Sequence, residues 1–373
     1  MKALFFSGDR QIFEEGSSVR ARFRAYASAI GEVHVACVAP HAKRAQDGSL
    51  FLHPLRGSRL FAASALRALI RTHNIEVISA QDPFEYGLVA WQAARGTRAK
   101  LHIQVHTDFL SLWFLRAGGF RSPRVPAPIL NHVRRLIADF VLPKAAGVRA
   151  VSVRVAQSLK GRYGSQVATP SVIPVSVTVA GTPPVPLPAH TASFMLITVG
   201  RLEPEKRIED ILYAIARIRF SYPAIGLTIV GSGSEEPRLR ALTRRLGLSK
   251  HVLFLGARSD AYGLMKSAQA YIQASAYEGY GRTLIEAALA RIPIITTDVG
   301  IVGEVFEGYR DVLAAPIADP AALAVHIRGL LDDHQARIKL VMSAEEAARN
   351  HLAAVGDPAN AVAADLRSLT QTV

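Results

Sequence analysis

The stretch Gln273–Glu304, QASAYEGYGRTLIEAALARIPIITTDVGIVGE, carries two glutamates, Glu278 and Glu286, with seven residues between them. A strand-like run, AYIQAS, overlaps its beginning, and a second run, IPIITTD, follows a segment with a helical pattern. Between the first strand and the helix lies a Gly-Tyr-Gly turn, where absent side chains let backbone N–H groups approach a ligand. In open α/β units, ligands bind at the carboxyl ends of strands beside helix N-termini. The stretch therefore predicts a ligand site flanked by the two glutamates.

Each glutamate also has an interpretation without a ligand. Apolar neighbours predict partial burial of Glu286, and a buried carboxylate requires hydrogen bonds that a polar ligand could supply. However, Thr283 and Glu286 also match a capping box, in which Thr283 caps the helix and Glu286 reaches back to its backbone N–H. Glu278 could be a solvated loop acid. The strands on either side favour the ligand site for both.

Length and composition indicate a two-domain globular protein. The chain has 373 residues, of which 50% are hydrophobic, and no apolar run is long enough to cross a bilayer. The opening MKALFFSGDR becomes polar too early for a signal peptide, so we expect a cytoplasmic protein. A single cysteine, Cys37, excludes an internal disulfide and leaves no cysteine cluster for zinc.

The positive charge is confined to the first half of the chain. Residues 1–178 contain 24 Lys and Arg against 10 Asp and Glu, a net charge of +14, whereas residues 179–373 contain 20 of each. This asymmetry predicts an anionic partner for the first half: a membrane surface, an anionic substrate or nucleic acid.

Strand-like and helical segments alternate along both halves, which predicts an α/β fold with two doubly wound, Rossmann-like domains facing an interdomain cleft. We place the first domain at 1–180, a Pro-rich linker at 181–190 and the second domain at 191–354. The C-terminal tail, about 355–373, is helical in pattern, and we expect it to pack back on the first domain.

Two further loops follow strands in the second half. Arg201 offers a planar fork and Lys206 a mobile charge, which suits a diphosphate, although a basic loop pairing with Glu203 and Glu205 is an equally good interpretation. Gly231 lies between a strand and a helix, as in a phosphate-binding loop. The chain lacks the glycine spacing of dinucleotide sites and the Gly-Lys-Ser/Thr of a P-loop.

In the first half, His106 ends a strand and could donate a hydrogen bond to a substrate hydroxyl or act in acid/base chemistry; a structural histidine is the alternative. Gly16 and Ser17 open the first helix and could present N–H groups to an acceptor, although an ordinary helix N-cap explains them equally well.

Arginine mixed with aromatic residues occurs in the first helix and around Trp113, a combination used by proteins that lie on anionic bilayers and also by nucleic-acid-binding proteins. The proposed membrane contacts are Arg20, Arg24, Trp113 and Arg116. Packing of Phe23 and Tyr26 in the core is the alternative for the first helix. No Asp-x-Asp motif or histidine–carboxylate cluster with metal-ligand spacing occurs, so we expect no metal.

Taken in order, these motifs resemble those of the retaining glycosyltransferases of family 4, which have the GT-B fold. The resemblance is strongest over VGRLEPEKRIEDILYAI, LTIVGSGSEEPRLRAL, VLFLGAR, the paired-glutamate stretch, DVGIVGEVFEG and ADPAALAVHI. In the first half it rests on HTDF and on the glycine before the first helix, where this chain has Gly16-Ser17 instead of two glycines.

The resemblance implies a role for each candidate residue. Arg201 and Lys206 would bind the donor diphosphate, and Glu286 the ribose hydroxyls. Glu278 would orient the donor sugar, which His106 would contact from the other domain. The loop that holds the sugar would consist of Gly279, Tyr280, Gly281, Arg282 and Thr283.

The implied function is transfer of a sugar, with retention, from a UDP-, GDP- or ADP-sugar to a lipid-linked, anionic or glycan acceptor, without a metal cofactor. We expect such an enzyme either free in the cytoplasm or peripheral on the inner face of the membrane, with no nucleic-acid partner. Two alternatives stay open: a nucleotide-sugar epimerase-like GT-B enzyme, and a basic nucleic-acid-binding protein on an inactive GT-B scaffold.

Overall fold

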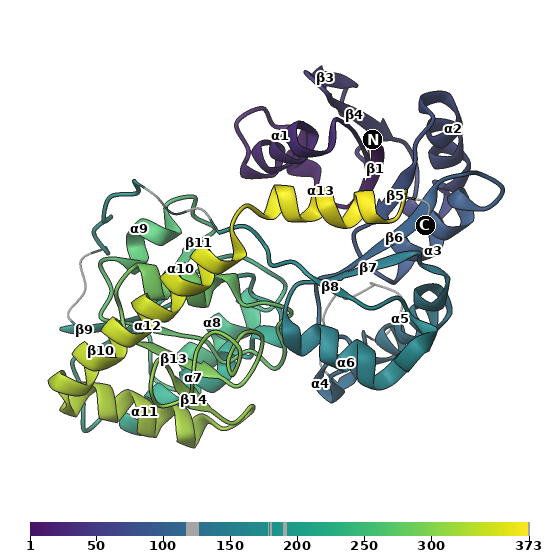
Figure 1. The fold of residues 1–373 in the computed structure, drawn as a ribbon. Helices are drawn as coiled ribbons and strands as arrows, with labels where there is room; N and C mark the ends of the chain where they lie inside the picture. The colour runs from purple at the N-terminus through teal and green to yellow at the C-terminus, as the bar shows by residue number, and fades with distance from the viewer. Residues whose placement is uncertain (117–126, 178, 180, 189–191, 372–373) are drawn as a thin grey trace. The chain divides into compact units, whose positions relative to one another are not determined.

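The computed structural model describes residues 1–116, 127–177, 179, 181–188 and 192–371, which form two compact units (Figure 1). The first unit contains Met1–Leu110, Leu130–Val175 and Val355–Val373, and the second contains Ser111–Ile129 and Ser176–Ala354. Each unit is built around its own sheet and hydrophobic core.

The first unit has an eight-stranded sheet in the order β3-β4-β2-β1-β5-β6-β7-β8. All neighbours are parallel except β3 and β4, which are antiparallel. The central strands are apolar and buried on both faces, as expected for parallel strands covered by helices. The strands are β1 Lys2–Ser7, β2 Glu32–Val38, β3 Ala45–Asp47, β4 Leu50–Leu55, β5 Val77–Ala80, β6 Lys100–Val105, β7 Gly147–Ala150 and β8 Ser171–Val172.

Helices α1, α2, α3, α5, α6 and α13 accompany this sheet. The last helix, α13, lies beside α1 (Figure 1). It belongs to this unit, because Val362, Ala363 and Leu366 share one core with Phe23 and Tyr26 of α1. The two aromatic side chains of α1 are therefore core residues. The bounds are α1 Ser18–Ile30, α2 Ala63–His73, α3 Glu85–Ala94, α5 Ala127–Val141, α6 Val153–Tyr163 and α13 Pro358–Ser368.

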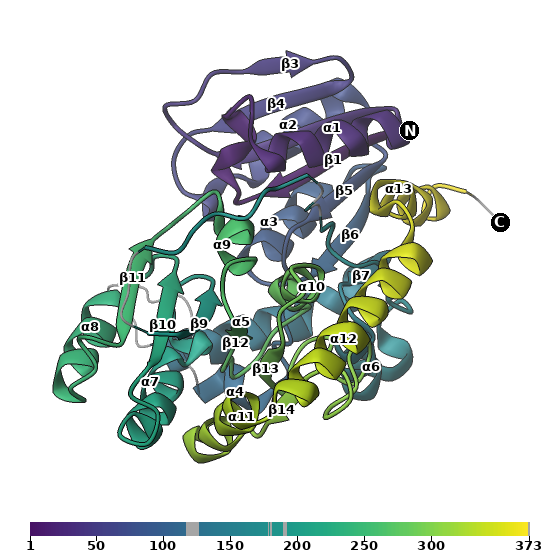
Figure 2. The ribbon, with the colours of Figure 1, turned by 90° about the vertical axis from the view of Figure 1, so that its left-hand side faces the viewer.

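The second unit has a six-stranded sheet in the order β11-β10-β9-β12-β13-β14, all parallel; β9, β10 and β11 lie side by side in Figure 2. The strands are β9 Phe194–Val199, β10 Ile225–Val230, β11 Val252–Gly256, β12 Ala270–Ile272, β13 Ile294–Thr297 and β14 Leu313–Ala315. The helices are α4 Leu112–Arg116, α7 Ile208–Ile218, α8 Glu236–Arg245, α9 Ala261–Met265, α10 Arg282–Leu289, α11 Pro320–Asp332 and α12 His334–Val355. Two doubly wound domains, the expected fold class, are confirmed.

One segment departs from the expected boundaries. Ser111–Ile129 was assigned to the first domain but groups with the second unit. Its described residues explain why: the ring of Phe114 lies 5.7 Å from that of Tyr277, and the guanidinium of Arg207 lies 5.5 Å from the ring of Trp113. Such aromatic contacts outweigh sequence adjacency to β6.

Among the described residues, no helix is both long and apolar enough to cross a bilayer.

Candidate active site

Two glycines at adjacent strand ends allow a close backbone crossing in the second unit. Gly200 follows β9 with φ 157°, and Gly231 follows β10 with φ 140°. A Cβ on Gly231 would lie 1.8 Å from the carbonyl oxygen of Gly200. The Gly231 N–H donates to the Gly256 carbonyl oxygen over 2.7 Å. The predicted donor-binding role of Gly231 therefore cannot use its N–H, and the absence of a side chain lets the two loops cross.

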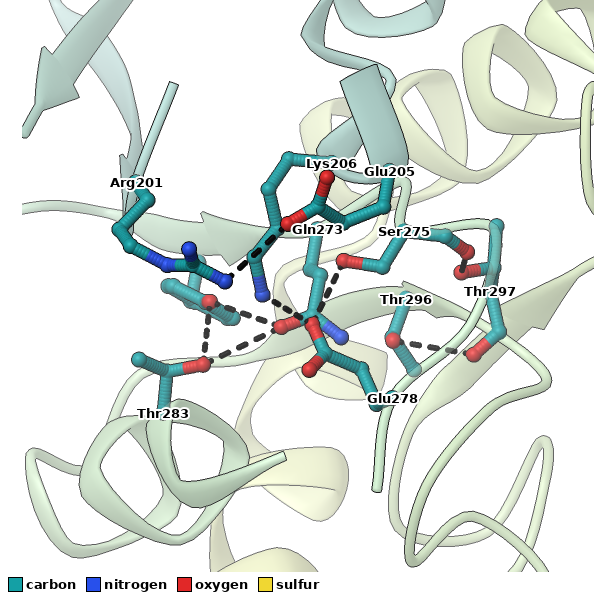
Figure 3. A network of polar contacts seen from close by, with 10 residues as sticks. Arg201, Glu205, Lys206, Gln273, Ser275, Glu278, Thr283, Thr296 and Thr297 are labelled. Atoms are coloured by element: carbon teal, nitrogen blue, oxygen red, sulfur yellow. Dashed lines mark hydrogen bonds and ion pairs between the residues drawn. The ribbon is translucent and has the colours of Figure 1, made fainter. Parts of the chain in front are cut away.

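Glu278 sits at the centre of a polar network formed by the loop after β12 and the turn Pro204–Lys206 (Figure 3). The Lys206 ammonium donates to its Oε1, and the Ser275 hydroxyl donates to the same oxygen over 2.8 Å. The Glu278 side chain is 15% exposed. Glu278 is therefore a paired, mostly buried carboxylate rather than a solvated loop acid.

Arg201 lies beside this network with a more exposed side chain. Its Nη2 is 3.2 Å from Glu205 Oε1, and 58% of the Arg201 side chain is exposed. The pairing is the one that the basic-loop interpretation expected. Burial raises the pKa of Glu205, and its Oε2 has no hydrogen-bond partner among the described residues. Because more than half of its side chain is exposed, this guanidinium is accessible to a second anion.

Helix α10 begins directly after the glycine turn and disproves the capping box. Gly281, with φ 90°, is the N-cap, and in the described structure no side chain caps this helix. Thr283 is therefore already inside the first turn. Its hydroxyl accepts from Tyr271 over 2.8 Å and donates to Gln273 over 3.1 Å (Figure 3). The backbone N–H groups at the start of α10 are left without a side-chain acceptor, which favours an anion there.

Glu286 lies one turn into α10 and is almost completely buried. Its Oε1 is 2.8 Å from Arg282 Nε, an ion pair between residues four apart. Burial raises the pKa of Glu286, and the charge of Arg282 opposes that rise. Glu286 is therefore held by a side chain, Arg282, that is itself more than half exposed.

Tyr280 takes part in the turn through its main chain only. Its ring is buried, and its hydroxyl lies 2.8 Å from His351 Nε2. Its carbonyl oxygen accepts from the Ile301 N–H over 3.0 Å, close to Gly300. The predicted donor-binding role therefore cannot use the phenol, which is committed to α12.

The matches to protein families cover most of the chain. Residues 186–351 match the model described as "Glycosyl transferases group 1", and residues 18–180 match "Glycosyltransferase Family 4". The chain belongs to the group 1 glycosyltransferases. The predicted family is thereby confirmed.

Individual relatives of this glycosyltransferase match parts of it. Glycogen synthase of Mycobacterium tuberculosis is 34% identical over 160 residues, which are 42% of this chain and 38% of that protein. The lipopolysaccharide core biosynthesis glycosyltransferase LpsD of Rhizobium meliloti is 29% identical over 157 residues, 42% of this chain and 45% of its own length. The chain thus spans less than half the length of these relatives.

One solved structure, that of HepE from Anabaena in complex with UDP and glucose, superposes with a TM-score of 0.73. It is 21% identical and covers 99% of both chains. At this identity the likeness establishes the GT-B fold.

In the first unit of the glycosyltransferase, His106 directly follows β6. Its Nε2 lies 3.0 Å from Gln104 Oε1, which also accepts from Arg149 over 3.2 Å. The Nε2 therefore carries the proton, and Nδ1 is the nitrogen that can accept a hydrogen bond. His106 was expected to donate a hydrogen bond to a substrate hydroxyl or to act in acid/base chemistry; with Nε2 committed to Gln104, the nitrogen left for a ligand is an acceptor.

Burial, together with the charges of Arg149 and Arg22, lowers the pKa of His106 to about 3. We therefore predict that its imidazole stays neutral at pH 5. Nitrogen chemical shifts of histidine side chains, measured between pH 7 and pH 5, should show no change in the resonances assigned by the His106→Gln variant. An imidazolium pattern for His106 at pH 5 would contradict this. Because the folded pKa lies below the unfolded value, stability from this group is full at neutral pH and falls as pH drops below about 6.5.

Two residues were predicted to bind the acceptor: Gly16 has free space around it, and Ser17 caps a helix. A Cβ on Gly16 would meet nothing within 4 Å. The Ser17 hydroxyl accepts from the Arg20 N–H over 3.1 Å and donates to the Gln11 carbonyl over 2.6 Å. Ser17 is thus the N-cap of α1, as the alternative interpretation held.

The predicted membrane contacts are corrected at Arg20. Its side chain is buried and its Nε donates to Asp47 Oδ2 over 3.2 Å. Arg24 is more exposed but pairs with the same carboxylate.

The other two predicted membrane contacts lie in α4. Trp113 is half-buried under Arg207, and Arg116 is exposed. Phe120 and Arg121, in the same sequence pattern, lie outside the described residues. Of the four contacts, only Arg116 is an exposed side chain without a partner among the described residues, which stop at this position and resume at 127.

Two polar residues adjoin the site although neither was predicted to bind a ligand: Gln273 was given no role, and Glu205 was expected only as an ion-pair partner of the basic loop. Gln273 and Glu205 each keep a buried polar atom, Nε2 and Oε2, without a partner among the described residues. Both adjoin the Glu278 network in Figure 3. No motif marks them, because their burial depends on how three loops meet.

Proposed function

We propose that the protein transfers a sugar from a nucleoside-diphosphate sugar to an acceptor hydroxyl, with retention of the anomeric configuration. The observation that carries this proposal is the meeting of Lys206, Glu278 and the uncapped start of α10 at the strand ends of the second unit. HepE, which shares the fold, binds UDP and glucose, and this supports the same ligand class here.

The donor diphosphate would bind beside the cationic side chains of Lys206 and Arg201. Lys206 now neutralises Glu278, and Arg201 is exposed beside it. Both cations and the N–H groups of α10 would stabilise the charge that develops on the leaving phosphate, which is electrostatic preorganisation. We propose that these groups, without a metal cofactor, serve the transfer.

Glu286 and Glu278 would hold different parts of the donor. Glu286 is buried and pairs with Arg282, whose side chain is 57% exposed, so ribose hydroxyls can replace Arg282 as its donors. Glu278 is fixed by Ser275 and Lys206, and a fixed carboxylate suits orientation of sugar hydroxyls. The turn residues Gly279 and Gly281 would bring backbone N–H groups close to the sugar.

In the reaction, the bond between the anomeric carbon and the phosphate oxygen breaks and the bond to the acceptor oxygen forms on the same face. The acceptor proton passes to the leaving phosphate oxygen. Neutral His106, accepting a hydrogen bond at Nδ1, would orient a substrate hydroxyl rather than transfer a proton. Glu278 is not required as a covalent nucleophile.

The test is product analysis. The protein should release nucleoside diphosphate from one of UDP-, GDP- or ADP-glucose when glycan or lipid-linked acceptors are added, and the product should keep the donor's anomeric configuration by proton NMR coupling. A product of inverted configuration would reject retention. Conversion of the donor's sugar without an acceptor would instead favour the epimerase-like alternative.

We also propose that the acceptor is presented at an anionic membrane surface. Helix α5 exposes Ile129, Val133, Leu136 and Phe140, which lie on one face at helical spacing. The first half of the chain, which contains this helix, carries the whole net charge of +14. An exposed apolar stripe on a basic unit is suited to an anionic bilayer. LpsD, which acts in lipopolysaccharide core biosynthesis, supports an acceptor of this kind.

Leu136→Asp should weaken binding to vesicles containing anionic lipid by about tenfold or more, since burying a leucine side chain contributes about 1.5–3 kcal/mol. Leu136 is 68% exposed, so the variant should fold. Phe220→Asp, at a position of 82% exposure in the second unit, is the matched control and should bind like wild type. Co-sedimentation measures both. Equal binding by all three proteins would remove α5 from the membrane contact.

A further inference from the structure

Three histidines from separate elements of the first unit gather at one place. His34 lies on β2, His53 on β4 and His73 at the end of α2. One ring nitrogen of each lies within 4.8 Å of the others. His34 and His53 are 19 positions apart in the sequence, and His53 and His73 are 20 apart, so the three histidines form no recognisable sequence motif.

The sheet register explains the meeting. In the parallel pair β2–β4, Ala36 is the partner of His53, and His34, two residues before Ala36, points to the same face. The rings of His34 and His53 are stacked with centroids 5.1 Å apart. The ring of His73 lies 4.3 Å from that of His34 and 5.5 Å from that of His53.

A hydrogen bond to Glu32 determines which ring nitrogen of His34 has the lone pair. Glu32 Oε1 lies 2.9 Å from His34 Nε2, which therefore carries the proton and leaves a lone pair on Nδ1. That Nδ1 lies 2.9 Å from His53 Nε2. A carboxylate behind a histidine is the arrangement that orients metal-ligating imidazoles in proteins. Glu32 is itself held by Lys2 over 3.0 Å.

One ring nitrogen of His53 lacks a hydrogen-bond partner. Its side chain is buried, and its Nδ1 has no hydrogen-bond partner in the described part of the chain. When Nδ1 of His53 carries the proton, its Nε2 lone pair faces the His34 Nδ1 lone pair across 2.9 Å, a repulsion that a cation shared by the two nitrogens would relieve. A neutral imidazole with an unshared lone pair is the form that ligates metals.

We propose that His34, His53 and His73 bind one divalent transition-metal cation, with Zn²⁺ the best fit. Three imidazoles with a carboxylate behind one of them match zinc coordination, and His73 is only half-buried, so water can take the fourth position. With Zn–N bonds of about 2.0–2.1 Å, two tetrahedral ligand nitrogens lie about 3.3 Å apart. The 2.9 Å gap between His34 and His53 needs only a small opening.

The bound cation would be structural. It would tie β2 and β4 to the end of α2 and so stabilise the first unit, because a ligand that binds only the folded state raises the free energy of unfolding. This proposal does not rest on the proposed sugar transfer. Nucleotide binding in the second unit should be the same with and without the cation.

The experiment uses the full chain, freed of any purification tag and treated with EDTA, and a titration with Zn²⁺ against a chromogenic chelator. Wild type should bind one Zn²⁺ per chain with a raised Tm, and Co²⁺ should give the visible absorption of a tetrahedral site. His73→Gln, at a half-buried position, should fold, bind Zn²⁺ at least about tenfold more weakly and lose the Tm rise. Glu32→Gln should weaken binding by about 10–100-fold.

His41→Gln is the matched control, because His41 is an exposed histidine of the same unit outside the cluster. It should bind Zn²⁺ like wild type. Equal affinities for wild type and His73→Gln would overturn the proposal, as would the absence of saturable binding to wild type. The metal-free Tm of His73→Gln checks that the variant is folded.

Discussion

Replacing Lys206 by methionine is expected to lower kcat/KM for sugar transfer by about 10²–10³-fold, because one preorganised charge at the leaving phosphate is removed. Methionine keeps the length of the side chain but not the ammonium. It also leaves Glu278 mostly buried without its cation, which should lower the free energy of unfolding by about 1–3 kcal/mol. Steady-state kinetics of nucleoside diphosphate release and urea unfolding measure the two effects separately.

Two further variants distinguish an effect on catalytic activity from an effect on stability. Adding Glu278→Gln to Lys206→Met removes the unpaired charge and should restore most of the stability, while the activity stays low. Lys250→Ala, at an exposed lysine of the same unit, should leave both quantities unchanged. If the double variant recovered activity together with stability, Lys206 would be a structural partner of Glu278 and would have no role at the phosphate.

Gly231→Ala should cause a large loss of stability, about 3–5 kcal/mol, because the new Cβ would meet the Gly200 carbonyl oxygen at 1.8 Å. The positive φ of 140° adds backbone strain for any residue with a side chain. The clash is with main chain, so no rotamer change can relieve it. Urea unfolding should show a lower midpoint, and donor binding should weaken because the Arg201 and Lys206 loop follows Gly200.

The control for this variant is Gly329→Ala in α11. Gly329 is exposed, and a Cβ there would meet nothing within 4 Å. Alanine in a helix interior should raise stability by up to about 1 kcal/mol. A Gly231→Ala protein as stable as Gly329→Ala would show that the two loops cross less closely than the structure indicates.

The fold could be predicted from periodicity because the strands of both sheets are apolar and bounded by turns. The runs KALFFS and FMLITV became β1 and β9 with their whole lengths buried or nearly so. The short antiparallel strand β3, Ala45–Asp47, was not predicted, since three polar or small residues carry no strand signal. Missing it had a consequence: Asp47 is the carboxylate that pairs with both Arg20 and Arg24, which were predicted to contact a membrane.

The sequence was sufficient to predict which residues belong to the candidate site, but not which of them pair with one another. Strand ends and glycine turns located Lys206 and Glu278, yet their ion pair joins residues 72 positions apart and depends on tertiary structure. The capping box failed because Gly281 starts the helix two residues earlier than Thr283. The His34, His53 and His73 cluster was missed for the same reason as the ion pair: strand register and a helix end, not spacing, bring it together.

The most direct measurement is isothermal titration of the protein with UDP-, GDP- and ADP-glucose. We predict one bound donor per chain for wild type and Lys250→Ala, with at least one of the three nucleotides, and a strong loss of affinity for Lys206→Met and Glu286→Gln. Wild-type protein that binds none of the three, or variants that bind as tightly as wild type, would contradict the donor site at Arg201–Lys206 and Glu278–Glu286.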